Sequence, residues 1–142
     1  MIYEVPIANK HLLFEKDFER FCEERGYELV DLSYHHNFKD DNASKLRRDF
    51  SPASLSIRLN PDLLVQKKNT NSFFVELKTG NCKNVIQVEA YQLLQNKVKE
   101  KYLKTTCLYI YRGELSNNKM IACPAQKIRA SKLVIPTAEK NH

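Results

Sequence analysis

The sequence predicts a mixed α/β fold in which helices cover a central sheet. An amphipathic helix pattern opens the chain, three strand-like runs follow it, and a second helix pattern precedes two further short strands. The 142 residues, with a mass of 16.6 kDa, are enough for one hydrophobic core and too few for two independent ones. We therefore expect residues 1–142 to form a single domain.

The first predicted element is a helix over residues 9–25. Its apolar residues recur at helical spacing with charged residues between them, and they are Phe14, Phe18, Phe21 and Cys22. Gly26 is typical of a residue that ends a helix. Residues 27–34 alternate between apolar and polar side chains and predict a strand. Residues 35–54 are polar and show no period, so we expect a long exposed loop there.

Two further strands are predicted in the middle of the chain. One covers residues 55–65 and is interrupted by Pro61, and the other covers residues 73–78. The polar residues 66–71 between them are typical of a turn. The two strands should therefore form a hairpin.

A second helix is predicted over residues 84–103, followed by strands at 106–111 and 119–122 and a short helix at 124–130. The second helix carries apolar residues along one stripe, and they are Val88, Tyr91, Leu94, Val98 and Tyr102. We expect such a stripe to pack in the core.

Composition excludes several classes of protein. Hydrophobic residues make up 42% of the chain and charged residues 28%, which is ordinary for a globular protein and excludes a disordered one. No stretch approaches the roughly 18 apolar residues of a membrane span, and the N-terminus lacks a signal-peptide pattern. We expect a cytoplasmic protein without membrane association. The four cysteines form no C-x2-C pair, which argues against zinc ribbons and iron–sulfur sites and favours reduced thiols.

The positive charge lies mainly in the second half of the chain. Residues 1–77 contain 11 Lys and Arg against 13 Asp and Glu, whereas residues 78–142 contain 12 against 4. The net charge of the whole chain is +6. A basic half is typical of a surface that binds a polyanion, and a merely solubilising surface is the alternative.

The predicted hairpin carries residues suited to catalysis. Asp62 follows Pro61 in its first strand, and Glu76-Leu77-Lys78 lies within its second. Because side chains alternate along a strand, Glu76 and Lys78 should share one face while Leu77 points to the other. If Asp62 pairs across the hairpin, two carboxylates meet one lysine.

This triad predicts metal-dependent hydrolysis of a phosphodiester. Two carboxylates are hard oxygen ligands suited to Mg2+ or Mn2+, and such an ion lowers the pKa of a bound water. The lysine can orient that water or neutralise charge on the phosphate. The alternative is that Glu76 and Lys78 form an exposed cross-strand ion pair, with Asp62 as a turn residue.

The motifs Pro61-Asp62 and Glu76-Leu77-Lys78 resemble the signature of the PD-(D/E)XK nuclease superfamily. The chain is similar in this respect to small archaeal Holliday-junction resolvases and RecB-like nuclease domains. The resemblance implies a restriction-endonuclease-like core, in which a mixed central sheet is flanked by helices in the order α-β-β-β-α-β. It also implies cleavage of nucleic acid, usually DNA, with Mg2+ or Mn2+ as cofactor.

The resemblance implies further site residues. In archaeal Holliday-junction resolvases the first helix carries a glutamate that completes the metal site, and Glu15 stands in a similar position, eleven residues before Gly26. RecB-like members carry Gln-x-x-x-Tyr after the lysine, which Gln87 and Tyr91 match. In relatives, the backbone carbonyl at the position of Leu77 is a metal ligand. A solvated glutamate is the alternative for Glu15, and core packing is the alternative for Tyr91.

Several basic residues are candidates for contacts with DNA phosphates, namely Lys45, Arg47, Arg48 and Lys83. The first three lie among aspartates, so a solvated loop is the alternative for them. The adjacent His35 and His36 could bind a metal or act as a base. Neighbouring strand residues face opposite ways, so at most one of them could join the site, and we expect a polar loop entrance instead.

We therefore expect a metal-dependent endonuclease that acts on branched or foreign DNA. Asp62 and Glu76 would bind the metal with Glu15 and the Leu77 carbonyl, Lys78 would act on the attacking water, and Gln87 would assist. The alternative is an inactive nuclease fold that only binds nucleic acid. A domain of this size that cuts both strands must act twice or act as a pair, so a homodimer is one possible form.

Overall fold

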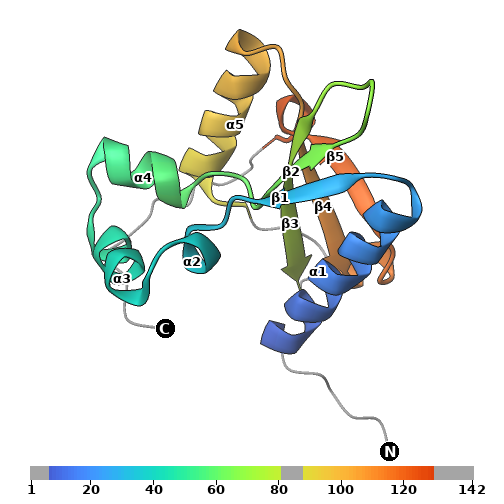
Figure 1. The fold of residues 1–142 in the computed structure, drawn as a ribbon, viewed down its shortest axis with the longest axis horizontal. Helices are drawn as coiled ribbons and strands as arrows, with labels where there is room; N and C mark the ends of the chain where they lie inside the picture. Colours follow the sequence, from blue (N-terminus) through green and yellow to red (C-terminus); the bar gives the residue numbers. More distant parts are fainter. Residues whose placement is uncertain (1–6, 81–87, 130–142) are drawn as a thin grey trace, which may run out of the picture.

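The centre of the molecule is a five-stranded sheet with the strand order β1-β2-β3-β4-β5 (Figure 1). The computed structural model describes residues 7–80 and 88–129. The strands are β1 (Glu28–Asp31), β2 (Leu63–Gln66), β3 (Phe73–Gly80), β4 (Cys107–Gly113) and β5 (Ile121–Pro124). Strands β3 and β4 are parallel and the other neighbours are antiparallel. The sheet is therefore mixed, as the sequence predicts.

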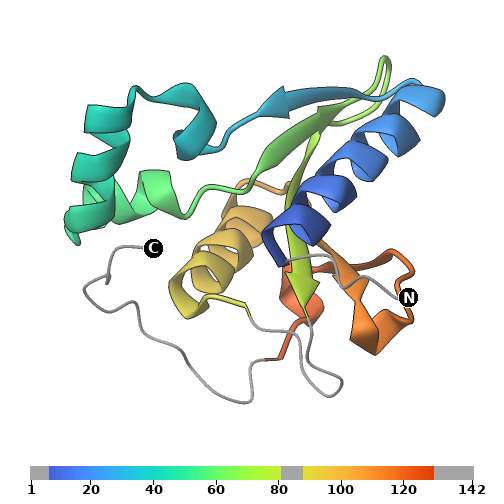
Figure 2. The same cartoon turned by 90° about the horizontal axis from the view of Figure 1, so that it is seen from below.

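Two long helices cover the two faces of this sheet. Helix α1 (Ile7–Glu24) lies on one face and α5 (Ala90–Tyr102) on the other (Figure 2). Three shorter helices connect β1 to β2, and they are α2 (Tyr34–Asn37), α3 (Asp40–Arg48) and α4 (Pro52–Arg58). Two 3-10 turns, η1 (Glu114–Ser116) and η2 (Ala125–Lys127), flank β5. The core order α1-β1-β2-β3-α5-β4 confirms the predicted α-β-β-β-α-β arrangement. No helix in the described ranges is long and apolar enough to cross a membrane.

Helix α1 confirms the predicted amphipathic pattern. Phe14, Phe18 and Cys22 are buried and pack against Val75 and Leu77 of β3. The helix ends where predicted, because Gly26 adopts φ 74° and the following amide of residue 27 donates to the Cys22 carbonyl at 2.9 Å. The apolar stripe of α1 thus fixes one face of the sheet as the main core.

Residues 35–54 do not form the exposed loop that we expect from their polarity. They lie in α2, α3 and the start of α4, which project to one side of the sheet in Figure 2. Helix α3 has two aspartates in its first turn and three basic residues in its last, which match the helix dipole. Its one buried residue is Ala43. The sequence pattern does not predict this helix, because charges at its two ends, rather than an apolar stripe, support it.

The strand predicted over residues 55–65 is wrong in its first half. Ser51 caps α4 by accepting a hydrogen bond from the Ser54 amide, and Pro52 occupies the first turn of the helix. Helix α4 runs to Arg58, and β2 begins only at Leu63. A Ser-Pro helix start is therefore the signal that outweighs the strand-like composition of this segment.

Helix α5 departs from the prediction in the face that it buries. Its buried residues are Gln92, Leu93 and Asn96. The predicted stripe is mostly exposed, with Tyr91, Leu94, Val98 and Tyr102 between 45% and 69% exposed. Residues 84–87 of the predicted helix lie outside the described ranges. An apolar stripe alone therefore gives the wrong rotation for this helix.

Hydrogen bonds stabilise both ends of α5. The Glu89 side chain caps the helix by accepting from the amides of Tyr91 and Gln92. Near the other end, the Glu100 carboxylate accepts from the backbone amides of Cys107 at 3.0 Å and Gln126 at 2.6 Å. The two Glu100 bonds link the helix to β4 and η2, and Gln92 and Asn96 are buried against the sheet.

Candidate active site

The candidate site lies where β2 ends beside β3. Val75 is the last residue of β3 that pairs with β2, whereas the pairing of β3 with β4 continues to Gly80. The edge of β3 beyond Val75 is thus open on the side of β2. Asp62 binds β3 at this edge through two hydrogen bonds. Its Oδ2 accepts from the Leu77 amide at 2.9 Å, and its own amide donates to Glu76 Oε2 at 3.1 Å.

Glu76 and Lys78 lie together on the α5 face of β3, as strand alternation predicts. The Lys78 Nζ is 3.7 Å from Glu76 Oε1, and Glu76 is only 6% exposed. The pKa of Glu76 is raised to about 8, mainly by burial and next by the neighbouring Asp62 charge, while the Lys78 charge opposes the shift. A pair of close carboxylates in a buried position favours either a shared proton or a bound cation.

The Leu77 side chain points the other way, into the α1 core, where it is 3% exposed. Its amide faces the open edge and Asp62. Because the N–H and C=O of one strand residue point to the same side, the Leu77 carbonyl faces that edge as well. A backbone oxygen and the Asp62 carboxylate therefore meet at the end of β2.

Gln92 is a site residue that the sequence analysis misses. Its side-chain amide donates a hydrogen bond to Glu76, while its Oε1 is buried and has no partner among the described residues. One turn later, Asn96 donates to the Tyr109 hydroxyl at 3.0 Å, and Tyr109 pairs with Glu76 in the β3–β4 register. The spacing of Gln92 and Asn96, four residues apart opposite the apolar stripe, is the signal that could have found them.

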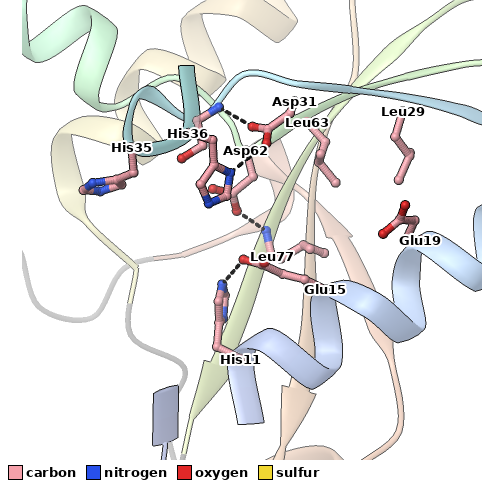
Figure 3. A pocket seen from close by; sticks show the side chains of 11 residues that line it. His11, Glu15, Glu19, Leu29, Asp31, His35, His36, Asp62, Leu63 and Leu77 are labelled. Atoms are coloured by element: carbon pink, nitrogen blue, oxygen red, sulfur yellow. Dashed lines mark hydrogen bonds and ion pairs between the residues drawn. The ribbon is translucent and has the colours of Figure 1, made fainter. Parts of the chain in front are cut away.

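A pocket of about 420 Å3 opens on the other side of Asp62. Asp62 and Leu77 line it together with Glu15 and His11 of α1, and His11 Nε2 lies 3.0 Å from Glu15 Oε1 (Figure 3). Glu76 and Lys78 are not among its lining residues. Asp62 therefore connects two groups of residues, Glu76 and Lys78 on one side and Glu15 in the pocket on the other.

The same pocket contains an imidazole–carboxylate pair that the sequence analysis does not predict. His36 Nδ1 lies 2.7 Å from Asp31 Oδ2, and Asp31 Oδ1 accepts the Ser33 amide at 2.8 Å. In Figure 3 the His36 ring is directed toward the middle of the pocket, while the His35 ring is directed away from it. The folding of residues 34–37 into α2 brings His36 over Asp31, which a loop prediction could not show.

The structure separates the predicted residues into three groups. Asp62, Glu76, Leu77, Lys78 and Glu15 gather around the end of β2. Lys45, Arg47 and Arg48 lie on α3, and none of them lines the pocket at Asp62. Gln87 and Lys83 lie outside the described ranges. The roles assigned to all these residues stay predictions.

The oxygen atoms around Asp62 fit a divalent cation. The two carboxylates of Asp62 and Glu76 interact directly, and the Leu77 carbonyl faces the same edge. Hard oxygen donors of this kind suit Mg2+ or Mn2+. Within residues 7–80 and 88–129, no three His, Cys, Asp or Glu side chains converge as a ready set of metal ligands. A third ligand must therefore come from the backbone, from water or from substrate.

The fold is similar to that of a solved nuclease. No protein-family model and no curated protein matches the chain. The structure of Hjc from Archaeoglobus fulgidus, a Holliday junction resolvase from an archaeal hyperthermophile, matches with a TM-score of 0.50 over 80% of this chain and 74% of that one. The two sequences are 15% identical. This similarity shows that the chain has the restriction-endonuclease-like fold.

Proposed function

We propose that this protein is a metal-dependent endonuclease that cleaves branched DNA. The observation that carries the proposal is the position of Asp62, which contacts both Glu76 and the Leu77 amide while Lys78 lies beside Glu76. Two carboxylates, a carbonyl and one lysine at an open strand edge suit phosphodiester hydrolysis. The Holliday junction resolvase of similar fold suggests branched DNA as the substrate.

Asp62, Glu76 and the Leu77 carbonyl would hold Mg2+ or Mn2+, with Glu15 reaching the ion through water. The ion, when bound, supplies Lewis acidity toward the phosphate and the nucleophilic water. Lys78 donates hydrogen bonds to the attacking water and places a positive charge beside the reacting phosphate. Gln92 fixes the orientation of the Glu76 carboxylate from the α5 side.

The basic residues of α3 would contact the DNA backbone away from the reacting phosphate. Lys45 and Arg48 are exposed, and Arg47 is half-buried. Lysines and arginines that contact phosphates set the position of a protein on DNA and add a salt-dependent term to its affinity. Lys83 would also contact a DNA phosphate, and Gln87 would assist the reaction.

The test is a cleavage assay with a four-way junction, a linear duplex, a supercoiled plasmid and single-stranded DNA, each with Mg2+, Mn2+ or EDTA. We expect cleavage of the junction only with metal. Asp62→Asn, Glu76→Gln and Lys78→Met should each lower the rate by about 10²-fold or more. Glu23→Gln, which changes an exposed carboxylate of α1, is the matched control. Absence of metal-dependent cleavage on every substrate would refute the proposal.

A DNA-binding module without catalysis is the second candidate. The observation that favours it is that no three metal-ligating side chains converge within the described ranges. This candidate predicts junction binding that is unchanged by EDTA and by Glu76→Gln. Fluorescence anisotropy with a labelled junction, measured beside the cleavage assay, separates the two candidates.

We propose further that the active form is a homodimer, because one domain with one site cannot cut two strands at once. Light scattering of the protein alone and with a four-way junction measures the mass of each species. A junction complex that contains one protein chain would refute this part of the proposal.

A further inference from the structure

The pair formed by His36 and Asp31 is fixed by backbone geometry at the end of β1. Asp31 is the last residue of β1, and the next amide, that of Leu32, donates to the Asp62 carbonyl at 2.8 Å. Asn37 Nδ2 donates to the Asp31 carbonyl at 3.0 Å and to the Ser33 carbonyl at 2.7 Å. The chain from β1 into α2 is thus tied to Asp31 on one side and to the backbone of Asp62 on the other.

This arrangement determines which nitrogen of His36 is available. An ionised carboxylate can only accept hydrogen bonds, so Nδ1 is the donor in the 2.7 Å contact with Asp31. The other nitrogen, Nε2, remains for a group in the pocket, and the ring is directed toward the middle of that pocket (Figure 3). The other titratable residues that line the pocket are His11, Glu15, Glu19, His35 and Asp62.

His36 and Lys78 lie on different sides of Asp62. His36 lines the pocket, whereas Lys78 lies beside Glu76 and does not. In a phosphoryl displacement the attacking and leaving oxygens stand roughly in line on opposite sides of phosphorus. A phosphate placed at Asp62, with its water on the Lys78 side, therefore directs its leaving oxygen into the pocket that contains His36.

We propose that His36 is the general acid that protonates the leaving sugar oxygen, with Asp31 as the residue that positions its ring. The inference rests on the proposed function and adds a catalytic residue to it. A bond forms between the water oxygen and phosphorus, and the bond from phosphorus to the sugar oxygen breaks. The leaving oxygen takes the proton from His36 Nε2. The water releases one proton to solvent, and His36 regains one from solvent, so the step is balanced.

The experiment compares His36→Gln with wild type on two matched junctions. The products of the wild-type reaction first identify which sugar oxygen leaves. One junction then keeps that oxygen and the other carries sulfur in its place, because a thiolate departs without being protonated. We expect His36→Gln to cleave the oxygen substrate about 10²- to 10⁴-fold more slowly than wild type does. On the sulfur substrate, the variant and the wild type should cleave at nearly the same rate. Asp31→Asn should show the same pattern more weakly.

Controls separate this role from others. His35→Gln changes the neighbouring histidine of the same pocket and should not give selective rescue by sulfur. Lys78→Met should be impaired on both substrates. Calorimetry with Mn2+ and anisotropy with the junction should give wild-type affinities for His36→Gln.

Four results would overturn the inference. Equal loss by His36→Gln on both substrates refutes proton donation, and weakened Mn2+ binding identifies His36 as a metal ligand instead. Unchanged cleavage by His36→Gln refutes any catalytic role while leaving the proposed function intact. A wild-type protein that cleaves neither junction refutes the proposed function itself, and the role of His36 with it.

Discussion

The two long helices bury different kinds of surface against the two faces of the sheet. Helix α1 packs Phe14, which is fully buried, over the apolar face of β3. Helix α5 turns Gln92 and Asn96 toward the other face, where Glu76 lies, and leaves Leu94 59% exposed. Helix α1 thus contributes an apolar face to the core, whereas α5 brings polar side chains to the face of the sheet that carries Glu76. Four measurements can break or sharpen this contrast.

The largest expected effect is on the α1 side. Phe14→Ala removes a fully buried aromatic ring from the core, and we expect the free energy of unfolding to fall by about 3–5 kcal/mol. Urea denaturation followed by circular dichroism measures this change. A loss below about 1 kcal/mol would show that α1 is not the main support of the sheet.

The second prediction concerns Glu76 and pH. In the metal-free protein its pKa is raised from 4.5 to about 8, so the folded state holds a proton that the unfolded state releases between these values. The contribution of Glu76 to stability is therefore full below pH 4.5 and declines as pH rises through about 8. Glu76→Gln should remove this decline in urea denaturation with EDTA at pH 5.5, 7 and 8.5. Glu23→Gln, at an exposed site, should keep the wild-type slope.

The third prediction tests Gln92 as a support of Glu76. Gln92→Ala removes the amide that donates to this carboxylate, and we expect the affinity for Mn2+ to fall by about 10- to 100-fold. Calorimetry measures the affinity directly. Gln95→Ala is the matched control, because Gln95 lies on the same helix but donates to the Ser56 carbonyl. Equal effects of the two variants would contradict a specific role for Gln92.

The smallest effect is expected on the exposed side of α5. Leu94→Ala should change the free energy of unfolding by less than about 0.5 kcal/mol, because its side chain is already in contact with solvent. Urea denaturation beside Phe14→Ala makes the comparison. A loss above about 1 kcal/mol would show that the apolar stripe of α5 is buried in solution.

Some elements are predictable because local pattern and tertiary packing agree. The stripe of α1 follows from the spacing of its apolar residues, and it is confirmed. The opposite directions of Glu76 and Leu77 follow from strand geometry, and they are confirmed as well. The sequence pattern does not predict helix α3, because charges at its two ends support it and its one buried residue is Ala43. The segment before Pro61 is not predicted correctly either, because the Ser51–Pro52 helix start outweighs its strand-like composition.

The candidate site also contains residues whose positions the sequence predicts and residues whose positions it does not. The shared face of Glu76 and Lys78 follows from strand alternation, because the period of two is a property of the backbone. The position of Gln92 does not follow, because it depends on the rotation of α5, and the Glu100 carboxylate stabilises that rotation through bonds to β4 and η2. The contact of His36 with Asp31 cannot be predicted from alternation either, because it requires the turn into α2.

The sequence by itself determined the order of the core elements and the Asp62, Glu76 and Lys78 set, since both depend on short-range periodicity and on residue chemistry. The tertiary structure decided what surrounds that set. The end of β2 leaves the edge of β3 open, α5 turns its polar face inward, and α2 brings His36 toward the pocket. The first two features depend on contacts between residues distant in sequence, and the third depends on the turn from β1 into α2, which brings His36 to Asp31.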